Sequence, residues 1–225
     1  MPTLCQVAVN KQPLGTGTFR PIRVKDLFRK LRILFWAGFW QSRKGIRVNI
    51  DKDHLYYGAA CLQVAEDDRY TSINQFRSNN RRVRCTYVVN NDIGLYLTYR
   101  GERSRRAKWD GDRTADEYLF TFDAGEIAKI DELCSRYPNT YLGLVCVQNE
   151  RICCLSNREL RELIALRRAD AGVQEDSYVI VVAIFPGTRM SMKVFVTPLG
   201  KRNRYLGKPL IVAECAFPSK IFVTT

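Results

Sequence analysis

The pattern of apolar and polar residues is most regular over residues 123–169, where a helical period gives way to two extended runs and then returns. Steps of three and four residues predict a helix that starts after Asp123 and ends before Pro138. Its apolar face consists of Ile127, Ile130, Leu133 and Tyr137. Strands are predicted over 140–147 and 151–155. A second helix then begins at Ser156, and its inward residues are Leu160, Leu163 and Ile164.

Both helix starts carry the same capping sequence. Asp123 precedes Glu126 by three positions, and Ser156 precedes Glu159 by the same spacing. In this arrangement the first side chain accepts a hydrogen bond from the amide three residues on, and the carboxylate bonds back to the first amide. The run over 140–147 is apolar without alternation, which predicts a central strand buried on both faces, with helices packed over it.

Shorter extended runs flank this unit. They predict strands over 46–50, 55–64, 84–89, 93–99, 118–122, 178–185, 192–197 and 210–212. A turn is expected at residues 90–92, a hairpin between 178–185 and 192–197, and docking of the apolar tail over 214–222. Together these elements predict an α+β fold with a mixed or mostly antiparallel sheet and about three main helices packed on it.

Length and composition fit a single domain over 1–225, since 225 residues of which 46% are hydrophobic can form a sizeable core. If the chain divides, the polar stretch 101–117 would separate a basic part, 1–100, from an α+β unit, 118–225. No apolar run approaches the roughly twenty residues that span a bilayer. Because the N-terminus also lacks a secretory signal pattern, we expect a cytoplasmic protein with reduced thiols.

The strongest helical pattern outside the central unit lies over residues 24–41. Its apolar face consists of Val24, Leu27, Phe28, Leu31, Leu34, Phe35 and Phe39. A neighbouring stripe holds Lys25, Arg29, Arg32, Trp36 and Trp40, with Lys30 beside it. Three interpretations stay open: a core-packing helix with a solvated basic face, a nucleic-acid contact in which cations bind phosphates and tryptophan stacks on bases, and a membrane-surface helix.

The formal net charge is +13, and it is unevenly distributed. The first fifty residues hold ten Lys or Arg and one Asp, whereas residues 101–150 hold seven basic and ten acidic residues. This asymmetry predicts a nucleic acid, RNA or DNA, or an acidic protein surface as the partner, although charged loops also serve solubility. The residues expected to contact nucleic acid are Lys25, Arg29, Lys30, Arg32, Trp36, Arg43, Lys44, Arg81, Arg82, Arg103, Arg105, Arg106, Lys108, Lys201, Arg202 and Arg204.

Candidate catalytic and metal-binding chemistry is sparse. His54 is the single histidine, which excludes zinc fingers and most histidine-rich metal sites. The cysteines form no C-x-x-C pair, and adjacent Cys153 and Cys154 would point to opposite faces of a strand, so we interpret the cysteines as core residues rather than zinc ligands. No lysine follows Asp, Glu or Gln by two positions, as a Mg²⁺-dependent nuclease strand would require. We therefore expect no catalytic residues, metal or cofactor.

The acidic stretch over 110–117 could suggest a calcium loop. Arg113 stands among its acids and the EF-hand spacing fails, so a flexible acidic linker that pairs with the preceding arginines is the expectation.

Two phrases in the C-terminal half, LVCVQNERICCLS over 144–156 and AFPSKIF over 216–222, resemble parts of an uncharacterised group of bacterial proteins. The resemblance implies a bacterial origin and a single C-terminal unit, and it implies no activity. The sequence thus predicts a non-catalytic nucleic-acid-binding protein that uses a basic helix and arginine-rich loops. The alternatives are a protein-interaction module of a larger assembly and a degenerate or unrecognised nuclease-like fold.

Overall fold

The structure is a computed structural model that describes residues 50–78, 81–106, 114–185, 191–198 and 205–223. At residues 81, 82, 105 and 106 it describes the backbone only. The helix predicted over 24–41 and nearly all of the strand predicted over 46–50 lie outside the described residues.

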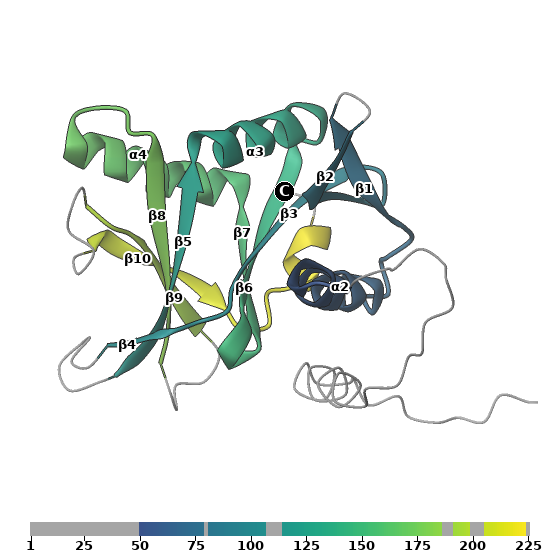
Figure 1. The fold of residues 1–225 in the computed structure, drawn as a ribbon, viewed down its shortest axis with the longest axis horizontal. Helices are drawn as coiled ribbons and strands as arrows, with labels where there is room; N and C mark the ends of the chain where they lie inside the picture. Colours follow the sequence, from purple (N-terminus) through teal and green to yellow (C-terminus); the bar gives the residue numbers. More distant parts are fainter. Residues whose placement is uncertain (1–49, 79–80, 107–113, 186–190, 199–204, 224–225) are drawn as a thin grey trace, which may run out of the picture.

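The described chain forms two five-stranded sheets (Figure 1). The first sheet has the order β1-β2-β3-β6-β7, in which β3 and β6 are parallel and the other neighbours antiparallel. Its strands are β1 (Ile73–Ser78), β2 (Arg81–Val89), β3 (Ile93–Arg100), β6 (Asn139–Cys146) and β7 (Arg151–Ser156). The second sheet is antiparallel throughout, with the order β10-β9-β8-β5-β4. Its strands are β4 (Ser104–Arg106), β5 (Ala115–Asp123), β8 (Ser177–Ile184), β9 (Ser191–Val196) and β10 (Leu206–Ala213).

Helices cover one end of the two sheets and the outside of the first. α3 (Ala124–Arg136) and α4 (Asn157–Ala171) lie along the upper end in Figure 1, and α2 (Lys52–Ala65) lies to the right. Short 3₁₀ turns, η1 (Val147–Asn149) and η2 (Ser219–Phe222), complete the described elements. Within these ranges every helix is too short or too polar to span a bilayer. The predicted α+β class is confirmed, and the division into two sheets is a feature that the periodicity did not indicate.

The two helices predicted over 123–169 are confirmed together with their caps. Asp123 Oδ1 accepts a hydrogen bond from the Glu126 amide at 2.7 Å, and Ser156 Oγ accepts one from the Glu159 amide at 3.2 Å. In each case the glutamate carboxylate accepts from the N-cap amide in return. α4 then ends at Gly172, whose φ of +69° lies in the left-handed region that glycine adopts without strain. Local hydrogen bonding therefore sets both ends of the central unit.

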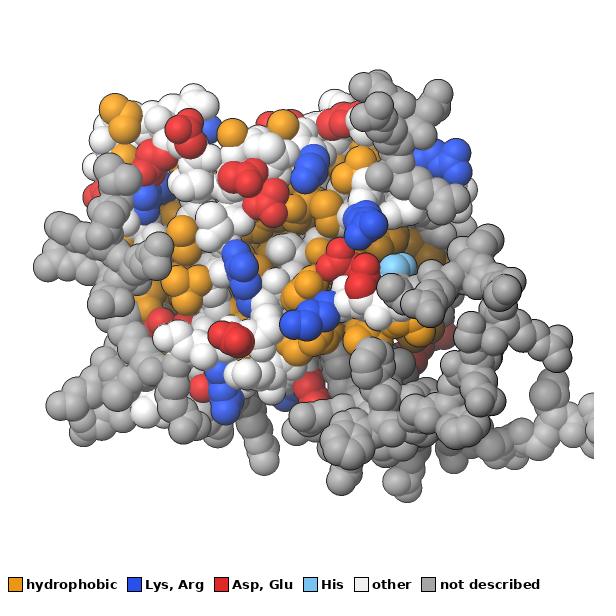
Figure 2. All heavy atoms as spheres, viewed as in Figure 1, with side chains coloured by type: hydrophobic (Ala, Val, Ile, Leu, Met, Phe, Trp, Pro, Cys, Tyr) orange, Lys and Arg blue, Asp and Glu red, His pale blue; other side chains and the backbone are white. Residues whose placement is uncertain are grey.

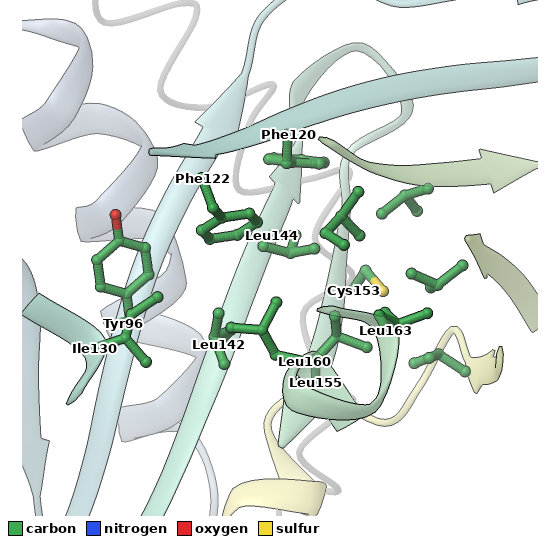
Figure 3. Packing of buried hydrophobic residues seen from close by; sticks show 14 of the residues in the cluster. Tyr96, Phe120, Phe122, Ile130, Leu142, Leu144, Cys153, Leu155, Leu160 and Leu163 are labelled. Atoms are coloured by element: carbon green, nitrogen blue, oxygen red, sulfur yellow. The ribbon is translucent and has the colours of Figure 1, made fainter. Parts of the chain in front are cut away.

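The main core lies between the two sheets and beneath α3 and α4. Figure 3 shows its side chains converging from both sheets and both helices, among them Tyr96, Phe120, Phe122, Ile130, Leu142, Leu144, Leu155, Leu160 and Leu163. A second core lies on the other face of the first sheet, beneath α2 and the C-terminal tail, where Phe217 and Ile221 are buried. The predicted burial of the central strand on both faces is confirmed, because Leu144 packs in the main core and Val145 in the second. The predicted docking of the tail is confirmed as well.

The strand predicted over residues 55–64 is wrong, because this segment is most of α2. Asp51 and His54 form the N-terminal cap, in which the His54 amide donates to Asp51 Oδ1 at 3.0 Å and the imidazole replaces the usual glutamate. The residues that pack on the first sheet follow a helical period: Tyr57, Ala60, Cys61 and Val64. Aromatic residues at 56 and 57 favoured a strand, but alanine and glutamine further on favour a helix, and packing on the sheet selects it.

The acidic linker predicted over 110–117 is wrong for its last two acids. Asp116 and Glu117 belong to β5 and are 2% and 7% exposed. Asp116 pairs with Arg103, as the linker interpretation anticipated, and Tyr205 donates a hydrogen bond to Glu117. Sheet pairing and these polar partners offset the cost of burying two carboxylates. β3 precedes residues 101–117 and β6 follows them, and these two strands pair within the first sheet.

Candidate nucleic-acid interface

The structure describes the side chain of one residue in the predicted nucleic-acid-binding set, Arg103. Arg81 and Arg82 open β2 and Arg105 and Arg106 end β4, with their backbones alone described. The remaining predicted residues lie outside the described ranges: Lys25, Arg29, Lys30, Arg32, Trp36, Arg43, Lys44, Lys108, Lys201, Arg202 and Arg204. The start of β2 and the end of β4 lie at opposite ends of the molecule in Figure 1, so the fold does not bring these two arginine pairs together.

Arg103 lies in the link between β3 and β4, where the chain passes from the first sheet to the second. Its Nη1 donates to Asp116 Oδ2 at 2.6 Å, and 36% of its side chain is exposed against 3% for Asp116. Asn149 Nδ2 donates to the same carboxylate oxygen at 3.0 Å from the turn between β6 and β7. Arg103 therefore neutralises a buried carboxylate, which ties it to the fold as well as to any ligand.

The same network includes Tyr118, which is buried beside Asn149. The Tyr118 hydroxyl donates to Asn149 Oδ1 and accepts a hydrogen bond from the Asn149 amide at 3.0 Å. Burial raises the pKa of Tyr118 to about 12, so the phenol stays protonated and keeps its donor role at neutral pH. This arrangement joins the two sheets at the end away from α3 and α4.

A surface hollow of about 380 Å³ lies next to Arg103 on the second sheet. It is lined by Glu117, Leu119 and Thr121 of β5 and Val179 of β8, together with Arg100, Glu102, Arg103 and Ser104. Two arginines and two glutamates cancel in formal charge, so the hollow by itself does not concentrate positive potential. Guanidinium and hydroxyl groups in its lining are nevertheless donors of the kind that bind phosphate oxygens.

The positive charge of the protein is not carried by the described side chains. They comprise sixteen Lys or Arg and twenty Asp or Glu, a net charge of −4. Nine of these sixteen cations form an ion pair with a described acid. The remaining side chains of the sequence comprise twenty basic and three acidic residues, a net charge of +17. On the face in Figure 2, single described Lys and Arg side chains stand among acidic and neutral ones.

The residues considered for catalysis or metal binding are His54 and the cysteines. His54 is an exposed capping residue at the start of α2. Cys153 faces the main core and Cys154 the second core, which confirms that the two point to opposite faces. Cys215 is exposed, so the prediction that it is a core residue is wrong. Among the described residues no three His, Cys, Asp or Glu side chains are grouped as metal ligands would be.

Sequence reasoning missed the Asp116–Asn149–Tyr118 network. Its members lie on two sheets and come from positions 116–149 of the chain, so no local spacing relates them. The sequence offered one signal for this network, because Asp116 and Glu117 are adjacent acids at the start of the apolar strand β5. Comparison of the chain with protein-family models, with curated proteins and with solved structures found no match.

Proposed function

We propose that this protein binds nucleic acid without catalysing a reaction on it, chiefly through Lys and Arg side chains outside the described set. The observation that carries the proposal is the separation of charge, with +17 on the side chains beyond the described set and −4 on those within it. Lys and Arg that neutralise phosphates release condensed counterions, and this release drives sequence-independent binding. The described cations are largely paired with acids, so they add little to this counterion release.

The segment over residues 24–47 is the main proposed contact. It holds seven Lys or Arg and one Asp, together with Trp36 and Trp40. Tryptophan stacks on unpaired bases, so the combination favours single-stranded nucleic acid over a duplex. Arg105 and Arg106, which end β4, are further candidates for phosphate contacts.

Filter binding of the full-length protein to a labelled single strand and to the matching duplex tests the proposal. We expect binding at about 50 mM salt whose log K falls linearly with log salt concentration, with a slope near −0.7 per phosphate contacted on a single strand. Replacing four cations of the N-terminal segment should weaken binding and flatten the slope: Lys25→Gln, Arg29→Gln, Lys30→Gln and Arg32→Gln.

The matched control removes four exposed cations among the described residues: Lys52→Gln, Lys129→Gln, Arg158→Gln and Lys208→Gln. It changes the net charge equally, so a general charge effect would weaken both variants alike. Absence of binding at about 50 mM salt, or equal losses in the two variants, contradicts the proposal.

A further inference from the structure

α2 carries a second apolar stripe that faces away from the sheet. Its members are Leu55, Gly58, Leu62 and Ala65, at steps of three, four and three residues. Leu62 is 50% exposed, and an added Cβ at Gly58 would meet no atom within 4 Å. Ile50, immediately before the N-cap Asp51, is 61% exposed. Leucines flanking an open glycine form a ridge and a notch, the surface against which a second helix packs closely.

We infer that the N-terminal segment over residues 24–41 docks as a helix on this stripe of α2. That segment has an apolar face of Val24, Leu27, Phe28, Leu31, Leu34, Phe35 and Phe39, which needs a partner. Nine residues, 42–50, separate this segment from Asp51, the N-cap of α2. Nine residues span up to roughly 30 Å, ample for an antiparallel return.

Length and charge both fit this occupant. An eighteen-residue helix over 24–41 is about 27 Å long and the fourteen residues of α2 about 21 Å, so the outer helix can cover the whole stripe. Residues 51–69 hold five acids, one lysine and one arginine. Asp51 already pairs with His54 and Arg84, and Asp67 with Arg69, whereas Asp53, Glu66 and Asp68 form no ion pair with another described residue. An antiparallel hairpin would bring Arg43 and Lys44 toward Asp53, and Arg20 and Arg23 toward Glu66 and Asp68. Opposite charges thus meet at both ends, whereas a second copy of α2 would bring acids against acids.

The docked arrangement leaves the basic stripe of the segment free. On a helix, Lys25, Arg29, Arg32 and Trp36 would lie about 115° around from the centre of its apolar face, at about 100° per residue. They would be held on the flank of the helix hairpin. The inference does not require that the protein binds nucleic acid, and its test contains none.

Hydrogen–deuterium exchange of the full-length protein, read on peptides from residues 24–41, tests the docking. We expect these amides to exchange about tenfold or more faster in the variant Leu62→Glu than in the wild type. Glutamate keeps the helix propensity of α2 while placing a charge in the apolar contact. Gly58→Leu, which fills the notch, should act in the same direction.

The matched control is Val173→Glu, which charges an equally exposed apolar side chain in the turn after α4, away from α2. It should leave exchange over 24–41 unchanged, and peptides from α2 should stay protected in every variant. Equal exchange over 24–41 in the wild type and Leu62→Glu overturns the inference. Protection that Leu62→Glu abolishes but that rises with protein concentration assigns the stripe to a second copy, and also overturns it.

Discussion

At the scale of single residues, burial decides the chemistry of the thiols. Cys153 and Cys154 are fully buried on opposite faces of β7, and Cys61 of α2 is partly buried against the first sheet. Burial raises the pKa of Cys154 and of Cys61 to about 12 and that of Cys153 well above its ordinary value. Thiolate is the reactive form, so these residues are inert at neutral pH. Cys215 is exposed instead.

We therefore expect brief alkylation of the native protein with iodoacetamide near pH 8 to label Cys215 well before Cys153 or Cys154. Peptide mass spectrometry gives the order, and the same reaction in urea, where every thiol is exposed, is the control. Labelling of Cys153 as fast as Cys215 in the native protein would contradict the buried assignment.

At the scale of elements, one ion pair attaches the C-terminal tail to the central unit. Lys220 Nζ of η2 lies 2.8 Å and 2.6 Å from the carboxylate oxygens of Glu159, and it also donates to the Cys154 carbonyl at 3.2 Å. Burial by itself raises the pKa of Glu159, but hydrogen bonds from Lys220 and Ser156 outweigh it and hold the pKa below its usual 4.5. The same glutamate thus caps α4 and anchors the tail.

The variant Lys220→Met should lower the free energy of unfolding by about 1–3 kcal/mol at pH 7, because it leaves a half-buried carboxylate without its cation. A depressed carboxyl pKa stabilises the fold fully above pH 4.5, and this contribution is lost as pH falls through the folded-state value. The difference between wild type and variant should therefore shrink in acid. Urea melts at pH 7 and about pH 3.5 measure it, with Lys208→Met, an exposed lysine, as control. A difference that is constant with pH would argue against the pair.

Close packing joins α3 to the first sheet at Gly94. A Cβ at this position would lie 2.5 Å from Thr140 Oγ1 and 3.0 Å from Leu133 Cγ. Neither neighbour moves easily, since Leu133 is fully buried and the Thr140 hydroxyl donates to the Tyr137 carbonyl at 2.6 Å. We expect Gly94→Ala to destabilise the protein by about 1–3 kcal/mol in denaturant melts. Gly101→Ala, where the added carbon meets no atom within 4 Å, should have little effect, and equal effects would refute the packing argument.

At the scale of the whole molecule, the two sheets are joined at one end by helices and at the other by polar side chains. Asn149 of the first sheet's turn contacts Asp116 and Tyr118 of the second sheet. Asn149→Ala removes a hydrogen bond to a buried carboxylate, so we expect a loss of about 1–3 kcal/mol. Asn74→Ala, at an exposed position of β1, is the control in the same thermal or urea melts. A change at Asn149 no larger than at Asn74 would mean that the network does not hold the sheets together.

Prediction from sequence succeeded where the signal was local. The caps at Asp123 and Ser156, the stop at Pro138 and the unbroken apolar run over 140–147 each lie within a few residues, so their elements could be placed closely. α2 was missed because its cap uses His54 in place of glutamate and its aromatics suggested a strand. For the candidate site, the pairing of Arg103 with a nearby acid was predicted, but the burial of that acid, Asp116, in a strand was not.

The sequence by itself determined the central helix–strand–strand–helix unit, the class of the fold and the excess of basic charge, because these depend on neighbouring residues or on composition alone. Only the tertiary structure decided that the strands divide between two sheets, that Asp116 is buried beneath Arg103, and that the described side chains carry a slight net negative charge. These features depend on which distant segments pair. Strand pairing is chosen by the burial of whole faces, and no local pattern contains that information.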